Sequence, residues 1–189
     1  MLIISHMILL IGASASGKTE VAKVLLSKFG MKKAITHTSR PIRPSEVDGV
    51  DYHFVTKETF QRLWDEGKLI ENTLYNGNYY GCSKAEIAKD KVVILDPNGL
   101  KKFQSLNDPS LITFLLTAEE ETRRKRMGIR GDAKEAIEKR IVNDRVAFSK
   151  EAIGHTDYEI ATEGKSIEEI ANLVYTTYIE ALKKKASRK

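Results

Sequence analysis

The chain has 189 residues, of which 41% are hydrophobic and 30% are charged, and its formal net charge is +5. This length fits one domain, and no apolar run approaches the roughly 20 residues of a membrane-spanning helix. The only cysteine, Cys82, excludes an internal disulfide and is typical of a reducing compartment, so we expect a cytoplasmic protein that does not bind membranes. The four histidines lack metal-ligand spacing, which argues against a zinc site.

The most specific motif follows the first apolar segment. Residues 12–19 read G-x-x-x-x-G-K-T, between an apolar run at residues 7–11 and a segment with helical spacing. A strand, a glycine-rich loop and a helix in this order are typical of a phosphate-binding P-loop. The motif therefore predicts that the protein binds a nucleoside triphosphate.

Each residue type in this loop has a physical role. Gly12 and Gly17 let the backbone direct its N–H groups toward an anion, and the following helix adds the positive end of its dipole. Lys18 supplies a charge for the outer phosphates, and the hydroxyl of Thr19 can ligate Mg²⁺. The expected triphosphate contacts are Gly12, Ala13, Ser14, Ala15, Ser16, Gly17, Lys18 and Thr19.

Strand and helix signals alternate along most of the chain, which predicts an α/β fold with a mainly parallel sheet. We expect strands at residues 3–11, 34–38, 92–95, 111–116 and 158–161. We expect helices at residues 20–29, 119–127 and 134–152, and a closing helix that begins at Ser166 and ends near residue 184. The strand at 92–95 ends at Asp96, and we expect Pro97 to break it.

Residues 40–90 have a different character. Segments 52–55 and 69–75 are rich in strand-forming residues, and Asn76-Gly77 is a strong signal for a type I′ hairpin. A helix is expected at residues 56–66, because its apolar side chains fall on one face. We interpret this region as an antiparallel insertion on a nucleotide-binding core.

Two arginines in this region suit a second phosphate. Arg40 and Arg43 lie three residues apart in a loop stiffened by Pro41 and Pro44. Two guanidinium groups held in this way can grip a phosphate with charge-assisted hydrogen bonds. An isolated pair at this spacing would equally fit an exposed turn.

Three further motifs follow the P-loop in a fixed order: T-S-R-x-x-R at residues 38–43, E-x-D-G-x-x-Y-x-F at 46–54 and G-N-Y-Y-G at 77–81. With them, the sequence resembles the guanylate kinase family from about residue 8 to residue 182. The resemblance implies a P-loop NTPase fold with a parallel sheet core, an inserted α+β acceptor-binding region and a helical lid. It implies one kinase domain, with its core at about 1–38, 91–124 and 153–189, the acceptor-binding region at about 39–90 and the lid at about 125–152.

The activity implied by the resemblance is transfer of a phosphoryl group from ATP to GMP, and also to dGMP, with Mg²⁺ as cofactor. Arg40 and Arg43 would hold the GMP phosphate, and Tyr52 and Tyr80 would add hydroxyl donors. The expected partners are these nucleotides and no nucleic acid, and the chain is expected to act as a monomer or homodimer.

The resemblance also implies how guanine is read. Glu71 would accept hydrogen bonds from N1–H and N2–H₂ of guanine, a pattern that adenine cannot offer. The family's usual serine or threonine at guanine O6 falls on Cys82, a weak donor, so Ser83 is the alternative contact. Asp96 is expected near the acceptor or, through water, near Mg²⁺, and Asn98 stands where a second acid is usual. The full expected acceptor set is Thr36, Arg40, Arg43, Tyr52, Glu71, Tyr80, Cys82, Ser83, Asp96 and Asn98.

Residues 123–130 form the densest positive run, which by itself would equally suit a nucleic-acid patch. In guanylate kinases the corresponding segment is the lid over ATP. Its phosphate-facing arginines match Arg126, Arg130 and Arg140, whereas residues 123–125 are expected to face solvent. The expected catalytic residues are Lys18, Arg40, Arg130 and Arg140, and the expected ATP contacts add Arg126 and Arg130 to the P-loop.

Three alternatives remain open from the sequence. One is a non-catalytic module that binds phosphopeptides, although such modules usually have a degraded P-loop. A second is a P-loop kinase that acts on another phosphate, such as a ribose bisphosphate, which would leave Glu71 and the tyrosine pair without a role. A third is a nucleic-acid-binding protein. Residues 161–164 lack the asparagine motif common on the family's adenine side, so backbone contacts would have to hold adenine.

Overall fold

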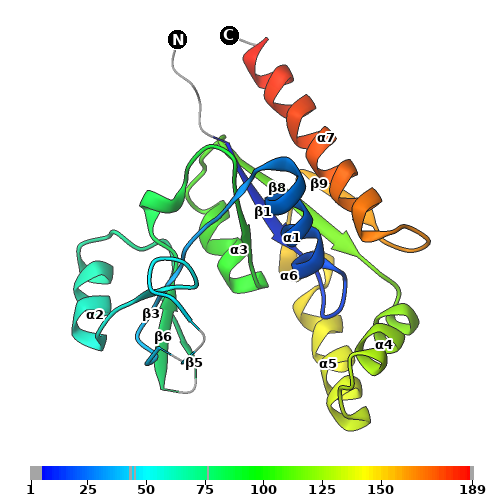
Figure 1. The fold of residues 1–189 in the computed structure, drawn as a ribbon, viewed down its shortest axis with the longest axis horizontal. Coiled ribbons are helices and arrows are strands. Elements are labelled where there is room, and N and C mark those ends of the chain that lie inside the picture. Colours follow the sequence, from blue (N-terminus) through cyan, green and yellow to red (C-terminus); the bar gives the residue numbers. More distant parts are fainter. Residues whose placement is uncertain (1–5, 43, 45, 76, 188–189) are drawn as a thin grey trace.

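The computed structural model describes residues 6–42, 44, 46–75 and 77–187, and its core is a five-stranded sheet (Figure 1). The strand order is β2-β7-β1-β8-β9, and every neighbouring pair is parallel. The bounds are Lys32–Lys33 for β2, Lys91–Ile94 for β7, Met7–Ile11 for β1, Leu111–Thr117 for β8 and Tyr158–Ala161 for β9. The expected parallel α/β core is confirmed, and residues 3–5 of the expected first strand lie outside the described residues.

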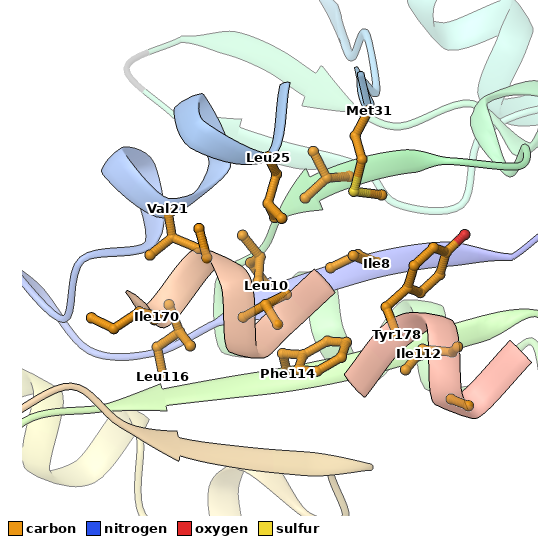
Figure 2. Packing of buried hydrophobic residues seen from close by; sticks show 14 residues of the cluster. Ile8, Leu10, Val21, Leu25, Met31, Ile112, Phe114, Leu116, Ile170 and Tyr178 are labelled. Carbon is orange, nitrogen blue, oxygen red and sulfur yellow. The ribbon is translucent and has the colours of Figure 1, made fainter. Parts of the chain in front are cut away.

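Strand β1 is the centre of this sheet, and alternate side chains enter two separate hydrophobic clusters. Ile8 and Leu10 face a cluster formed with α1 (Lys18–Phe29) and α7 (Ile167–Ala186) (Figure 2). Met7, Leu9 and Ile11 face the other cluster, to which α3 (Pro97–Gln104) and α6 (Lys150–Ile153) contribute. Because both faces of β1 are covered, all five residues are buried, which explains the continuous apolar run in the sequence.

The strand at 92–95 ends before Pro97 as expected, since β7 ends at Ile94. The helix that follows it, α3, is an element that the sequence analysis does not include: it begins at Pro97, because proline fits the first helical position and Asp96 caps the helix through a 2.7 Å hydrogen bond from Gly99 N. The expected helix at 134–152 is two helices, α5 (Lys134–Ala147) and α6. The break arises because the Ser149 hydroxyl accepts from Ala152 N and so starts a new helix.

The expected strand at residues 34–38 is also wrong, because the chain changes sheets there. Strand β2 ends at Lys33, and β3 (His37–Thr38) belongs to a second sheet of order β4-β3-β6-β5. Backbone hydrogen bonds follow the crossing: Ala34 N donates to Val92 O in the core, and Thr36 O accepts from His53 N in the second sheet. Residues 34–36 therefore connect the two sheets.

The second sheet also contains β4 (His53–Phe54), β5 (Thr73–Tyr75) and β6 (Asn78–Gly81). Strand β6 is antiparallel to both neighbours, but β3 and β4 are parallel, so the expectation of a wholly antiparallel region is wrong at β4. The expected hairpin is confirmed by the Tyr75–Asn78 pair, although Asn76 lies outside the described residues and its turn type stays a prediction. Helix α2 (Lys57–Asp65) covers this sheet, with Phe60 buried and stacked on Tyr79.

Helices α4 (Glu120–Ile129) and α5 form a second arm, which projects from the same side of the core sheet as the arm built from α2 and the second sheet (Figure 1). Met127, Ile137 and Ile141 form a small buried cluster between the two helices, and Ala15 packs against it. The P-loop is thus part of the base of this arm. Among the described residues, no helix is both long and apolar enough to span a bilayer.

A buried tyrosine of helix α7 forms a hydrogen bond with the residue that precedes β1. The Tyr178 hydroxyl donates to His6 O at 2.9 Å and lies 3.2 Å from Asp90 Oδ1. We predict that Tyr178→Phe lowers the free energy of unfolding by about 1 kcal/mol, because this hydrogen bond is lost while the ring remains.

Urea denaturation measures that change. Tyr175→Phe is the matched control, since its ring stacks on Phe29 and no hydrogen bond of its hydroxyl is found among the described residues. Equal effects of the two substitutions would contradict the assignment.

Candidate active site

The P-loop, residues 12–19, connects β1 to α1 as the motif predicts. Gly12 has φ +155°, and a Cβ there would lie 2.3 Å from Leu116 O. Gly17 at the helix N-cap has φ +99°. These two glycines are therefore required by close backbone approach and by left-handed geometry. Ala15 has φ +60°, which is uncommon for a residue with a Cβ.

Lys18 is folded against its own loop. Its Nζ donates to Gly12 O at 2.5 Å and to Ala13 O at 2.9 Å, with Ser16 Oγ at 3.4 Å. Burial lowers the pKa of Lys18 to about 8, while the charge of Asp144 raises it and that of Arg123 lowers it. The ammonium group is therefore still mostly charged at neutral pH and is held inside the loop.

Two of the expected lid arginines lie beside this loop. Arg126 donates to Ala15 O at 3.2 Å and to Thr162 Oγ1 at 3.1 Å. A cavity of about 350 Å³ lies between the loop and the lid, and both Arg126 and Arg130 line it together with Ala15, Gly17, Lys18 and Thr19. Thr162, which is fully buried, is a contact that the sequence did not reveal, because nothing in its neighbourhood matches a known motif.

Arg130 and Arg140 come together on one carboxylate. Arg140 Nη1 lies 2.7 Å from Asp132 Oδ2, and Arg130 Nε donates to Asp132 Oδ1 at 3.2 Å. Both arginine side chains remain about half exposed. Asp132 therefore gathers the two cations at the edge of the lid, and it is a second residue that sequence reasoning missed.

Residues 123–125 do not all face solvent as expected. Lys125 is 72% exposed, which confirms the expectation for that residue, but the Arg123 side chain is only 5% exposed. Arg123 is buried because its guanidinium lies against Asp144 of α5, at 2.6 Å. A run of basic residues in a sequence can thus contain a buried arginine when a neighbouring helix supplies a carboxylate to pair with it.

A second cavity, of about 330 Å³, lies between the second sheet and the end of β7. Five of the expected acceptor residues line it: Thr36, Tyr52, Glu71, Tyr80 and Asp96. A further cavity of about 350 Å³ shares Thr19 with the P-loop cavity, and it shares Thr36 and Tyr52 with the second cavity. Thr19 therefore borders the first and third cavities, and Thr36 and Tyr52 border the second and third.

Glu71 is a partly buried acid in the second cavity. Burial, together with the smaller effect of the nearby Asp96 charge, raises its pKa to about 7. Two glycines make room for its segment: a Cβ at Gly99 would lie 2.8 Å from Glu71 Oε2, and one at Gly81 would lie 2.4 Å from Glu71 O. The site thus holds a carboxyl group that can change its protonation near neutral pH.

Arg40 is not among the residues that line this cavity, but it interacts with Tyr52 and Tyr80, which do. Its Nη2 donates to Glu46 Oε1 at 2.7 Å, which raises the pKa of Arg40, and a hydrogen bond with Tyr80 adds to that effect. The guanidinium also lies 5.7 Å from the centre of the Tyr52 ring, within cation–π range. Arg43 lies outside the described residues, so its predicted role stays a prediction.

Three expected acceptor residues lie elsewhere in the structure. Cys82 is fully buried in the core cluster beside α3, and burial raises its thiol pKa to about 12, with Glu71 adding to the effect. The Ser83 hydroxyl accepts from Ala85 N at the start of the short 3₁₀ helix Lys84–Glu86. Asn98 is exposed in the first turn of α3. None of the three is among the described residues that line the second cavity.

The comparisons with known proteins agree with this geometry. The family model for guanylate kinase matches residues 4–181. The chain belongs to the guanylate kinase family. It is similar to the guanylate kinase of Aliivibrio fischeri, with 30% identity over 153 residues, or 76% of this chain and 72% of that one. The guanylate kinase of Chromohalobacter salexigens is 32% identical over 140 residues, or 70% of this chain, and that match spans 65% of the relative's own length.

A solved guanylate kinase from Anaplasma phagocytophilum has the same fold, with a TM-score of 0.62 and 24% identity over 93% of this chain and 86% of that chain. The P-loop NTPase architecture expected from the resemblance to guanylate kinases is thereby confirmed.

The raised pKa of Glu71 leads to a pH-dependent stability. A carboxyl whose pKa is near 7 when folded and 4.5 when unfolded keeps its proton longer in the folded state, so its contribution is full below pH 4.5 and is lost as the pH rises through 7. We predict that Glu71→Gln, compared with the wild type, gains up to about 3 kcal/mol of stability between pH 5 and pH 8.

Urea denaturation at the two pH values measures this gain. Glu180→Gln, on the exposed face of α7, is the control and should show no such gain. A pH-independent difference between Glu71→Gln and the wild type would show that the Glu71 carboxyl titrates normally.

Proposed function

We propose that this protein transfers the γ-phosphoryl group of ATP to GMP, giving ADP and GDP, and that it accepts dGMP as well. The observation that supports the proposal is a pair of unlike cavities in a chain of the guanylate kinase family: one is lined by the P-loop, the other by Glu71 and two tyrosines, and a third cavity shares lining residues with both. A kinase acting between two nucleotides needs such a pair of neighbouring sites.

The acidic cavity suits a guanine nucleotide. The ionised Glu71 carboxylate can accept from the adjacent N1–H and N2–H₂ groups of guanine, whereas adenine would place an acceptor against it. Arg40, with the hydroxyl groups of Tyr52 and Tyr80, supplies the donors for the acceptor phosphate. Guanine selection in this proposal rests on Glu71 and Asp96, because Cys82 and Asn98 do not line the cavity.

The chemistry needs no strong general base. The second pKa of a phosphate monoester is about 6, so the attacking oxygen is already anionic near neutral pH. Catalysis then consists of holding the two nucleotides in line and neutralising the charge of the transferred group. Lys18 serves the donor phosphates, for which it leaves its carbonyl partners in the loop, and Arg40 serves the acceptor.

The lid completes the donor site in this proposal. Arg126 and Arg130 line the donor cavity, and Arg140 is gathered with Arg130 on Asp132. Closure of α4 and α5 over the P-loop would bring these charges to the transferring phosphoryl group and exclude water that would hydrolyse ATP. The functional units are accordingly the core, the acceptor-binding region at about 39–90 and the lid at about 125–152.

Mg²⁺ is the expected cofactor. In phosphoryl-transfer sites this ion is held mainly by substrate phosphates and water, with only one or two protein oxygens. The Thr19 hydroxyl at the donor cavity fits that donor set, and Asp96 is the candidate for a contact through water. The bound ion would neutralise charge on the β- and γ-phosphates. A cytoplasmic location is part of the proposal and rests on the free, buried thiol of Cys82.

A coupled assay of ADP release with GMP, dGMP, AMP, CMP and UMP tests the proposed function. Turnover is expected with GMP and dGMP and to be far slower with the other three. A preference for another base would overturn the assigned role of Glu71. Turnover with none of them would favour a binding module, and retention on heparin that survives saturating ATP and GMP would favour a nucleic-acid-binding protein.

Substitution of Lys18 and of Arg40 should distinguish effects on the donor nucleotide from effects on the acceptor nucleotide. We predict that Lys18→Ala and Arg40→Ala each lower kcat/KM by about two or more orders of magnitude, because each removes a charge that the transition state needs. The KM for GMP should rise in Arg40→Ala.

Steady-state kinetics with each nucleotide varied in turn measures these effects. The matched controls are Lys28→Ala, an exposed lysine on α1, and Arg62→Ala, an exposed arginine on α2. Near-normal turnover in either site variant would exclude the role assigned to that residue.

A further inference from the structure

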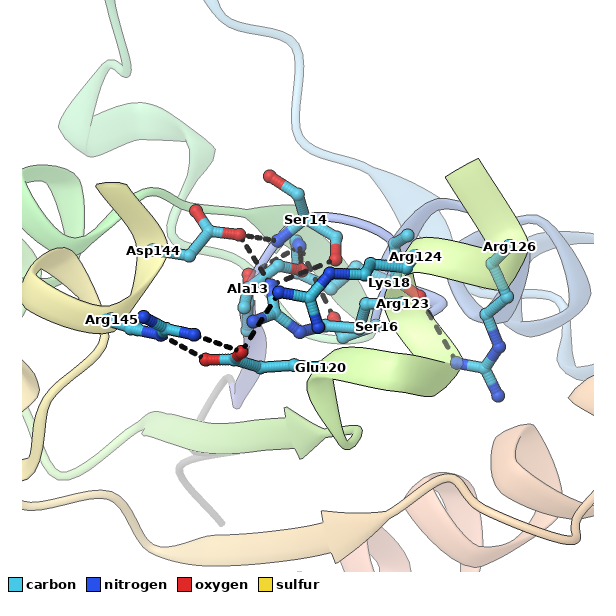
Figure 3. Close-up of polar contacts among 12 residues, drawn as sticks. Ala13, Ser14, Ser16, Lys18, Glu120, Arg123, Arg124, Arg126, Asp144 and Arg145 are labelled. Atoms are coloured by element: carbon cyan, nitrogen blue, oxygen red, sulfur yellow. Dashed lines mark hydrogen bonds and ion pairs between the residues drawn. The ribbon is translucent and has the colours of Figure 1, made fainter. Parts of the chain in front are cut away.

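The lid and the P-loop are joined by a buried ion pair that no motif predicts. Asp144 of α5 and Arg123 of α4 lie 2.6 Å apart, with side chains that are 11% and 5% exposed (Figure 3). The same carboxylate oxygen, Asp144 Oδ2, also accepts from Ser14 N in the P-loop at 2.8 Å. One carboxylate therefore contacts both the lid helix α4 and the P-loop.

Side chains of α4 and α5 contact the peptide groups on both sides of Ser14. While Asp144 accepts from the Ser14 N–H, Arg123 Nη1 lies 3.5 Å from the Ser14 carbonyl oxygen. The next carbonyl, that of Ala15, accepts from Arg126. Residues 14–15 of the P-loop are thus fixed by side chains that come from α4 and α5.

This is the part of the loop that most needs support. Ala15 has φ +60°, a left-handed conformation that costs of order 1 kcal/mol for a residue with a Cβ. Such conformations persist only where the surroundings over-determine them. Here the surroundings are the Asp144–Arg123 pair, Arg126 and the apolar cluster of the lid against which Ala15 packs.

We propose that Asp144 is a positioning residue for the donor site: with Arg123, it holds the Ser14–Ala15 segment in the shape that directs the P-loop amides at the donor phosphates. This rests on the proposed role of the loop in binding ATP. The charges of Asp144 and Arg123 also act on Lys18: the carboxylate raises the pKa of the lysine, and the guanidinium lowers it. The ion pair thereby couples the arrangement of the lid helices to donor binding.

A neighbouring ion pair provides the matched control. Arg145, the next residue on α5, contacts Glu120 of α4 through two hydrogen bonds of 2.6 and 2.7 Å (Figure 3). This pair bridges the same two helices, but the Arg145 side chain is 57% exposed, and among the described residues the pair makes no hydrogen bond to the P-loop. If Asp144 only joined the two helices, Arg145→Gln should have the same effect as substitution of Asp144.

The test compares Asp144→Asn with Arg145→Gln by steady-state kinetics and by calorimetric titration with ATP. In Asp144→Asn we expect KM and Kd for ATP to rise about 10- to 100-fold, since a displaced loop loses its aligned amides, while KM for GMP is unchanged. In Arg145→Gln both should stay at the wild-type values. An unchanged affinity for ATP in folded Asp144→Asn, or an equal loss in Arg145→Gln, would overturn the proposal.

Asp144→Asn leaves Arg123 buried without its partner, which can prevent folding. The double variant Arg123→Met/Asp144→Leu leaves no unpaired buried charge, because it removes both members of the ion pair. It also removes the contacts of Asp144 and Arg123 with Ser14. We expect it to melt near the wild-type temperature and yet to bind ATP weakly. Wild-type ATP affinity in this variant would overturn the proposal. Calorimetric binding keeps the result separate from the proposed function, since it does not depend on turnover with GMP.

Discussion

The close approach of Gly12 to the backbone of β8 is the constraint on which the site depends. A Cβ at position 12 would lie 2.3 Å from Leu116 O, so only glycine lets the P-loop rest on this strand. Strand β8 then leads directly into α4, which brings the α4–α5 arm to the same end of the sheet. The crossover at residues 34–36 carries the chain from β2 of the core to the second sheet.

Among the described residues, the basic side chains proposed to bind phosphate are each paired with a carboxylate or a backbone carbonyl of the protein. Lys18 donates to loop carbonyls, Arg40 to Glu46, and the pair Arg130 and Arg140 to Asp132. A bound phosphate would exchange these partners for its own oxygens rather than meet unsolvated charges, because each cation already has a favourable partner. The arrangement keeps several positive groups close together without strong mutual repulsion. The buried pair of Arg123 and Asp144 differs, since it contacts the P-loop backbone instead of lining a cavity.

Pro97 marks the end of a strand, as its residue type predicts, but it also begins helix α3, because a capping aspartate precedes it. The place of Cys82 after the G-N-Y-Y-G motif predicts a contact with guanine, yet its side chain is fully buried in the core cluster. A motif fixes the order of residues, but tertiary packing decides which side chains are buried and which reach the cavity. Glu71 and Tyr80, in contrast, line the cavity where the pattern placed them.

Local patterns of glycine, charge and apolar spacing were enough to predict the P-loop, the parallel α/β core and the family. They also identified most of the residues that line the P-loop cavity and the cavity of Glu71. Three features became visible only in the folded chain: the buried pair of Arg123 and Asp144, the gathering of two arginines on Asp132, and the contact of Thr162 with Arg126. These depend on how separate helices and strands pack, and contacts between residues distant in the chain leave no periodic signal in a single sequence.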